Sequence, residues 1–306
     1  MRGSRAIRTV AWAALAAGVA APLLRRRLGL SPPAVAATAA AAPFALCVVR
    51  PRTPARDVAT CCLQMWAYVA VYQMPADEPE ALERRVHVDY PVAVDRVLGL
   101  GVPPTLRLQW RLAAPGRFAR RDKVLIWAHW LWFLTPHAAL AYILAFHRDR
   151  FPRAAAHMYG VFDVGTGLYW LVPTAPPWYA AAHGRLEYGR MPHLRRMMYE
   201  YGEQFWKRGW QPLYDFLGGN PLAAMPSLHF ATTVMGAHLL GETGALAGAV
   251  GWAYAGTLGV ALVYLGEHYL VDLLAGLALA EGVRRLAPAV GPALARVSRG
   301  VRPARA

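Results

Sequence analysis

Tyr264-Leu-Gly-Glu-His268-Tyr-Leu-Val-Asp272-Leu-Leu-Ala-Gly276 is a mostly apolar stretch near the C-terminus that carries three ionisable residues. An ionisable side chain inside an apolar, membrane-type segment is costly, so its presence indicates a function. His268 and Asp272 are four residues apart, a spacing that predicts one shared face of a helix. The carboxylate can then hold one ring nitrogen of the imidazole and leave the other free to react.

The composition indicates a protein with several membrane-spanning segments. Of its 306 residues, 56% are hydrophobic and only 17% are charged, which is low for a soluble domain. The net charge of +15 falls in short arginine clusters between apolar runs. This pattern fits membrane topology and anionic lipid headgroups, and it argues against nucleic-acid binding. Cys47, Cys61 and Cys62 lack metal-ligand spacing, and we interpret them as small apolar side chains.

Residues 1–56 are expected to form N-terminal hydrophobic segments and a basic linker. Apolar runs at Val10–Leu24 and Ala34–Val49 flank the triplet Arg25-Arg26-Arg27. Arginines between two spans fit the positive-inside rule poorly. Two short transmembrane helices, or one such helix and one interfacial segment, therefore both remain open. The first run also resembles a signal peptide.

Residues 57–287 are expected to form an all-α transmembrane core, and 288–306 a basic cytoplasmic tail. The apolar runs of this core are Val58–Met74, Val124–Phe146, Ala154–Val172, Ser227–Leu240, Gly244–Leu265 and His268–Leu286. Among them, Val124–Phe146 is the clearest single spanning helix. The stretches 75–123 and 179–224 are predicted to be extracytoplasmic or interfacial loops, with an amphipathic helix around Leu106–Leu112.

Following these runs across the membrane places three polar segments at one face: Pro173–Tyr179, Pro226–His229 and Glu267–Asp272. Each lies at a helix end, where a shared pocket can form. The basic loop 147–153 and the basic tail lie at the opposite face, which the positive-inside rule makes cytoplasmic. The pocket is therefore expected to face the extracytoplasmic side of the cell membrane.

Two histidines and an aspartate suit phosphoryl transfer without a metal. His268 would attack phosphorus as the nucleophile, with Asp272 fixing its tautomer. His229 would protonate the leaving oxygen and then deprotonate the acceptor hydroxyl. Ser227 and the backbone N–H groups at the start of its helix would bind phosphate oxygens, although Ser227 could instead be an N-cap.

Pro226-Ser-Leu-His229 and His268-Tyr-Leu-Val-Asp272 resemble the second and third motifs of the type 2 phosphatidic acid phosphatase (PAP2) superfamily. Three longer segments resemble the inositol-phosphotransferase branch of this superfamily, which includes the fungal inositol phosphorylceramide synthases. They are Pro173-Thr-Ala-Pro-Pro-Trp-Tyr179, Ala224-Met-Pro-Ser-Leu-His229 and Tyr264-Leu-Gly-Glu-His-Tyr269. The resemblance implies a six-helix core, His268 as nucleophile, Asp272 as its partner, His229 as acid and base, and no metal or other cofactor. It favours a phospholipid donor, such as phosphatidylinositol, and a hydroxyl acceptor.

The sequence departs from the phosphatases of that superfamily, which carry a Lys-x6-Arg-Pro word and a Ser-Arg pair before the third motif. No Lys-x6-Arg-Pro word exists here, and the position six before His268 is Leu262. Cations of the 179–224 segment are candidates to bind phosphate instead: Arg185, Arg190, Arg195, Arg196, Lys207 and Arg208. Trp178 and Tyr179 are candidates to line a headgroup or acyl entrance, and Glu267 to support the site.

Other interpretations stay open at this point. The protein could hydrolyse a lipid phosphate or a polyprenyl pyrophosphate. It could also be a lipid transporter or scramblase in which His229, His268 and Asp272 relay protons. A divalent ion on these three residues and Glu267 is a further idea. His129 and His137 are interpreted as packing or water-cavity residues. Membrane lipids are the expected partners, and the sequence indicates no protein partner.

Overall fold

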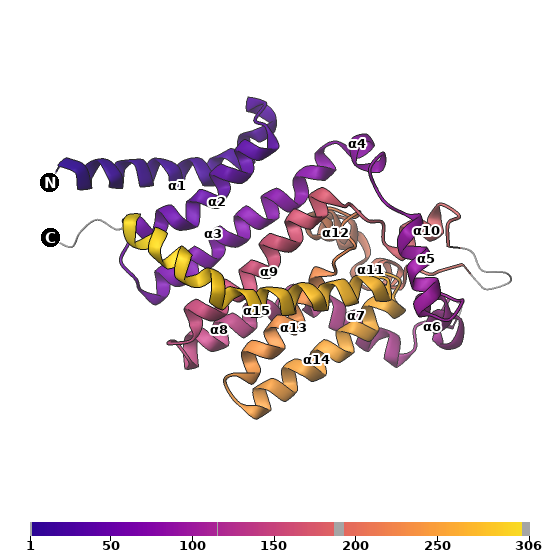
Figure 1. Cartoon of the computed structure of the whole chain (residues 1–306). Coiled ribbons are helices and arrows are strands. Elements are labelled where there is room, and N and C mark those ends of the chain that lie inside the picture. The colour runs from indigo at the N-terminus through magenta and orange to yellow at the C-terminus, as the bar shows by residue number, and fades with distance from the viewer. Residues whose placement is uncertain (1, 115, 187–192, 302–306) are drawn as a thin grey trace. The chain divides into compact units, whose positions relative to one another are not determined.

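The computed structural model describes the chain except residues 1, 115, 187–192 and 302–306. The described chain is all-α, as predicted, and its few extended residues form only isolated bridges from Thr174 to His87 and to Ala223 (Figure 1). Among the described residues, three helices are long and apolar enough to cross a membrane, and a bent pair adds a fourth crossing if it forms one span. The chain is therefore a polytopic membrane protein. It divides into two compact units, 1–77 with 284–306, and 78–283.

The first unit begins with three helices: α1 (Arg2–Leu28), α2 (Pro32–Val49) and α3 (Pro54–Gln73), followed by the short 3-10 helix η1 (Met74–Asp77). Both α1 and α2 are long and apolar enough to span a membrane, so both N-terminal runs have the character of spans. The arginines between them are partly neutralised, since Asp77 accepts bonds from Arg25 at 2.7 Å and Arg26 at 2.6 Å. Partial burial tends to raise the pKa of Asp77, but these two arginines outweigh it and lower the pKa.

The second unit holds the remaining helices. They are α4 (Pro79–Glu83), α5 (Asp89–Leu98), α6 (Pro104–Leu112), α7 (Arg120–Leu131), α8 (Thr135–Phe146), α9 (Phe151–Leu171), α10 (Pro177–Ala182), α11 (Met197–Trp206), α12 (Trp210–Gly218), α13 (Leu228–Gly241), α14 (Ala245–Tyr264) and the first part of α15 (Leu270–Val301), with the 3-10 helix η2 (Lys207–Gly209) between α11 and α12. The amphipathic helix expected around Leu106–Leu112 is α6. Helix α15 continues to Val301, into the segment predicted as a basic tail.

The spanning helix predicted over Val124–Phe146 is broken into two helices, α7 and α8. The chain bends by 58° between α7 and α8. Pro136 has no N–H for a helical bond and crowds the preceding turn. The N–H groups of Phe133, Leu134 and Thr135 bond three residues back instead of four, which tightens the chain into a short turn. The bend turns the end of α7 toward α13, with consequences for the site.

Small residues let α13 and α14 pack closely as an antiparallel pair. A side chain on Gly251 would come within 2.8 Å of the Ala237 backbone, and one on Gly248 would meet Gly241 at the same distance. Such contacts are typical of helices that associate in membranes. The ends of α9, α13 and α14 thereby bring the segments around Thr174, Ser227 and His268 together, as the sequence predicted.

Candidate active site

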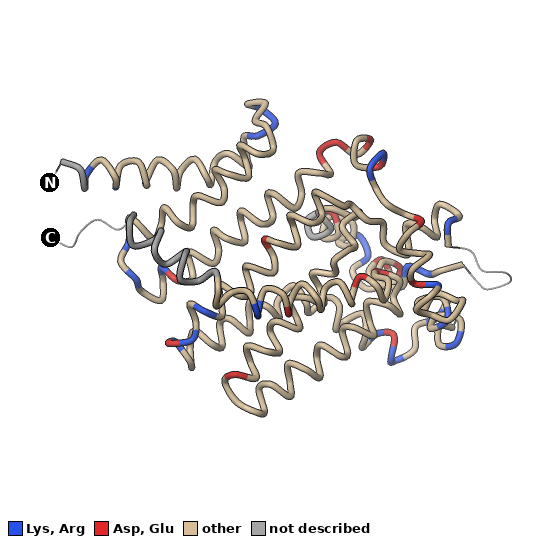
Figure 2. Tube along the Cα trace, viewed as in Figure 1, with Lys and Arg blue, Asp and Glu red and all other residues tan. Residues whose placement is uncertain are grey.

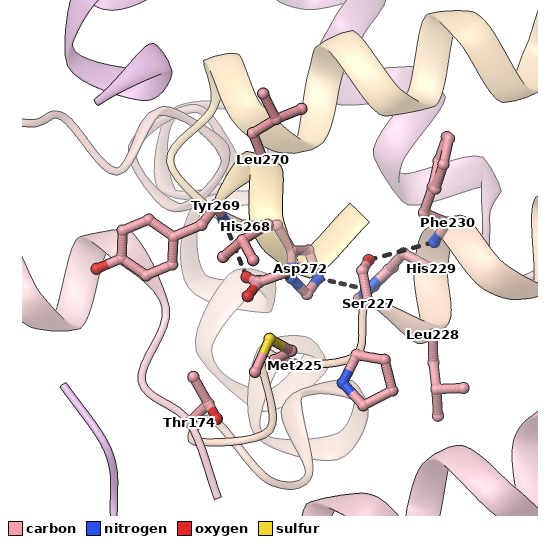
Figure 3. A network of polar contacts seen from close by, with 12 residues as sticks. Thr174, Met225, Ser227, Leu228, His229, Phe230, His268, Tyr269, Leu270 and Asp272 are labelled. Atoms are coloured by element: carbon pink, nitrogen blue, oxygen red, sulfur yellow. Dashed lines mark hydrogen bonds and ion pairs between the residues drawn. The ribbon is translucent and has the colours of Figure 1, made fainter. Parts of the chain in front are cut away.

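The centre of the site is a direct contact between two imidazole rings. His229 lies in the first turn of α13 and His268 in the turn that follows α14, and Nδ1 of His229 is 3.2 Å from Nε2 of His268 (Figure 3). His268 is 4% exposed. The two histidines selected from the sequence therefore meet, although 39 residues separate them.

Asp272 holds the other nitrogen of His268. Its Oδ2 lies 3.2 Å from Nδ1 of His268 and also accepts the backbone N–H of Tyr269 at 2.9 Å. The predicted pair is present, but not on one helical face, because α15 begins only at Leu270. Asp272 is the third helical residue, and its side chain bonds back to the residue before the helix, as the acid of a capping box does. The four-residue spacing works through this cap.

The two contacts orient the ring of His268. A carboxylate accepts only, so Nδ1 of His268 donates to Asp272. His268 is thus held with Nδ1 toward Asp272 and Nε2 toward Nδ1 of His229. This is the arrangement that attack at phosphorus requires.

The start of α13 is fixed by contacts that leave His229 in place. Ser227 is completely buried, its hydroxyl accepts the N–H of Phe230 at 3.3 Å, and its own N–H donates to the Asp272 carbonyl at 3.0 Å. Ser227 is therefore the N-cap of α13, and its role in phosphate binding stays a prediction. Gly276 makes this approach possible, because a side chain there would lie 2.6 Å from the Ser227 carbonyl oxygen.

Asp95 of α5 is a site residue that the sequence analysis missed. It is completely buried, and its carboxylate accepts the N–H groups of Leu270 at 3.1 Å and Val271 at 2.9 Å. Burial raises the pKa of Asp95 to about 6, against the opposing effect of these two bonds. Asp95 therefore caps the helix that carries Asp272, from a segment 175 residues away. An acid in a polar, mixed-charge stretch gives no sequence signal of this role.

His129 and Trp132 were also missed as neighbours of the site. The ring of His129 stacks on the ring of His229 with centroids 5.0 Å apart. The centroid of the Trp132 ring lies 4.1 Å from that of His229. The indole N–H of Trp132 donates to Thr232 in α13 at 2.9 Å. The bend between α7 and α8 makes these contacts possible, and a straight helix did not predict them. The interpretation of His129 as a packing residue holds, but what it packs against is His229.

The predicted binding residues lie at different distances from this centre. Trp178 is anchored beside this centre, since its backbone N–H donates to the Gly266 carbonyl at 3.2 Å. Tyr179 points elsewhere and stacks on His183 with centroids 4.0 Å apart. Glu267 precedes His268 directly. Its Oε1 is buried with no hydrogen-bond partner among the described residues, and burial raises its pKa. Arg190 lies outside the described residues.

The idea of a divalent ion at this centre finds no support in the geometry. Among the residues that the structure describes, no group of three His, Cys, Asp or Glu side chains is arranged to hold a metal ion. His268 instead uses one ring nitrogen for Asp272 and the other for His229.

The fold and the buried His–His–Asp chain at its helix ends are those of an all-α membrane enzyme. The chain is a member of the PAP2 superfamily, whose sequence model matches residues 91–286. Members of this superfamily are phosphatases and phosphotransferases, and the protein is an enzyme of this kind. The curated proteins and the solved structures gave no match.

Proposed function

We propose that the protein transfers a phospho-headgroup from a membrane phospholipid to a hydroxyl acceptor through a phosphohistidine on His268. One observation carries the proposal: Asp272 occupies Nδ1 of His268, and the free Nε2 faces His229 at 3.2 Å. A nucleophile, its orienting carboxylate and a second proton carrier are thereby in line.

In the first step, Nε2 of His268 bonds to phosphorus, and the bond from phosphorus to the diacylglycerol oxygen breaks. The leaving oxygen takes a proton from His229. The hydrogen bond between the two rings must open as phosphorus enters, because Nε2 gives its lone pair to phosphorus. In the second step His229 removes the proton of the acceptor hydroxyl, the acceptor oxygen bonds to phosphorus, and the bond to His268 breaks.

The side of the membrane is part of the same proposal. α9 has 21 residues and is therefore roughly 30 Å long, so the loop before it and the site beyond it lie at opposite ends. That loop carries Arg148, Arg150 and Arg153 together with Asp149, and Figure 2 shows basic and acidic residues both there and in the loops beyond the other end of α9. The positive-inside rule makes the loop cytoplasmic, so the site would face the extracytoplasmic side.

The test is to trap the intermediate. Purified protein would be incubated with headgroup-labelled phosphatidylinositol, phosphatidic acid and polyprenyl pyrophosphate, with and without EDTA. We expect acid-labile label on the wild type but not on His268→Ala, and no effect of EDTA. His238→Ala is a matched control, since His238 of α13 also pairs with a carboxylate, that of Glu281 in α15, at 2.6 Å.

The outcomes separate the alternatives. Transfer of label to an added hydroxyl acceptor supports the transferase, whereas release to water alone would make the enzyme a phosphatase. Label that persists on His268→Ala, or turnover without any labelled protein, would contradict the mechanism.

A further inference from the structure

A site that handles phosphate needs a cation, because the oxygens of a phosphate ester carry negative charge that grows or shifts during transfer. The centre described above holds two imidazole rings and a carboxylate, and no arginine or lysine. The cations of the 179–224 segment are the candidates from the sequence, and the structure distinguishes among those that it describes.

Most of these cations are committed elsewhere or exposed. Arg195 binds Glu200 with an Nε–Oε2 distance of 3.0 Å and donates to backbone carbonyls. Arg185 pairs with Asp89 at 3.6 Å on the surface. Lys207 and Arg208 are exposed.

Arg196 differs from them in its surroundings. Its guanidinium carbon lies 3.6 Å from the centre of the Trp178 ring, and the rings of Tyr199 and Tyr214 flank it at 5.1 and 5.2 Å. One terminal nitrogen donates to the Tyr214 hydroxyl. Within the described chain no carboxylate lies within ion-pair distance of Arg196, and its buried Nε has no hydrogen-bond partner. A partly desolvated cation on aromatic faces, with a donor unused, is prepared to bind an anion.

The chain holds Arg196 beside the catalytic turn. The amide of Gln109 accepts the N–H of Arg195 at 2.8 Å and donates to the carbonyls of Arg195 and Tyr264, each at 2.9 Å. This clamp joins the segment before Arg196 to the end of α14. The Gly266 carbonyl meanwhile accepts the N–H of Trp178, so the aromatic support of Arg196 is anchored to the same turn.

Two further polar atoms near the two rings are also without a hydrogen-bond partner among the described residues. Oε1 of Glu267 and Nδ1 of His129 are buried without a partner among the described residues, and the charge of Arg196 acts on Glu267. Buried polar atoms in proteins are almost always bonded. Nε of Arg196, Oε1 of Glu267 and Nδ1 of His129 are therefore available to a polar ligand.

We propose that Arg196, supported by Trp178, is the residue that binds the phosphate group of the substrate beside His268. The inference rests on the proposed function for the identity of that substrate, a phosphate ester of a lipid, but the binding of phosphate itself does not depend on turnover. The planar guanidinium can engage two phosphate oxygens at once, which a lysine cannot do.

The experiment measures binding of radiolabelled orthophosphate by equilibrium dialysis to the full-length protein in detergent. Arg196→Gln should weaken binding at least tenfold. Arg196→Lys should weaken it less, because the charge remains. Arg208→Gln, a change to an exposed cation of the same segment, should leave it unchanged. Thermal unfolding of each variant checks that it is folded.

Binding to Arg196→Gln within twofold of the wild type would overturn the proposal, and so would a wild type that binds no orthophosphate. Failure of the proposed function looks different: no donor would label His268, while orthophosphate binding would still depend on Arg196. If a donor does turn over, Arg196→Gln should raise its KM more than Arg208→Gln does.

Discussion

Gly276 allows a sharp test of how the site is assembled. An alanine side chain at this position would place its Cβ 2.6 Å from the Ser227 carbonyl oxygen and 3.4 Å from the Ala231 nitrogen, both of them backbone atoms. Carbon and oxygen atoms in helix contacts stay about 3.3 Å apart, so α13 and α15 must separate by about 0.7 Å. Backbone atoms cannot rotate away as a side chain can.

The separation acts directly on the contact between the two imidazole rings, because His229 belongs to α13 and His268 is tied to α15 through Asp272. Adding 0.7 Å to their 3.2 Å contact gives about 3.9 Å, which is beyond hydrogen-bonding distance. A misplacement near 1 Å costs about 100-fold in rate. We therefore expect Gly276→Ala to lower kcat by about 10- to 100-fold. Overpacking should also destabilise the fold by about 1–3 kcal/mol.

The assay compares initial rates and acid-labile labelling with thermal unfolding in detergent. Gly282→Ala is the matched control on the same helix, because a side chain there meets nothing within 4 Å. It should keep full activity and gain a little helix stability. If Gly276→Ala were folded and its rate stayed within twofold of the wild type, the geometric reasoning would be refuted.

Other predictions concern the elements around the site. Asp95→Ala removes the acceptor of two N–H groups at the start of α15. It should lower the free energy of unfolding by about 1–3 kcal/mol and the rate by more than tenfold. Asp89→Ala, at an exposed position of the same helix α5 as Asp95, should change neither. Burial raises the pKa of Asp95 to about 6, so protonation of Asp95 stabilises the folded state relative to the unfolded one. This contribution should be complete below about pH 4 and lost as the pH rises through 6, by at most about 3 kcal/mol. Thermal unfolding of Asp95→Asn should lack this part of the pH dependence, and an unchanged profile would contradict it. Trp132→Phe removes the bond to Thr232 and should reduce kcat several-fold without changing KM, so a change in KM alone would speak against a role in orienting His229.

The sequence alone was sufficient for the features that have a local physical cause. Apolar runs predicted where the long helices lie, and Pro173–Pro177 predicted where α9 ends. His268 and Asp272 stood out because ionisable residues are rare in apolar segments, and the spacing predicted their pairing. The order of the runs placed His229 at the same membrane face, and the two rings do meet.

Only the tertiary structure decided which distant residues lie beside the site. Asp95 and Arg196 occur in polar stretches of the sequence, so no local signal marks them among their many charged neighbours. The sequence did not predict the 58° bend after α7, because an apolar run is compatible with both a straight and a broken span. At this bend the Trp132 ring lies against His229. These placements depend on contacts between segments far apart in the chain, which periodicity and composition do not encode.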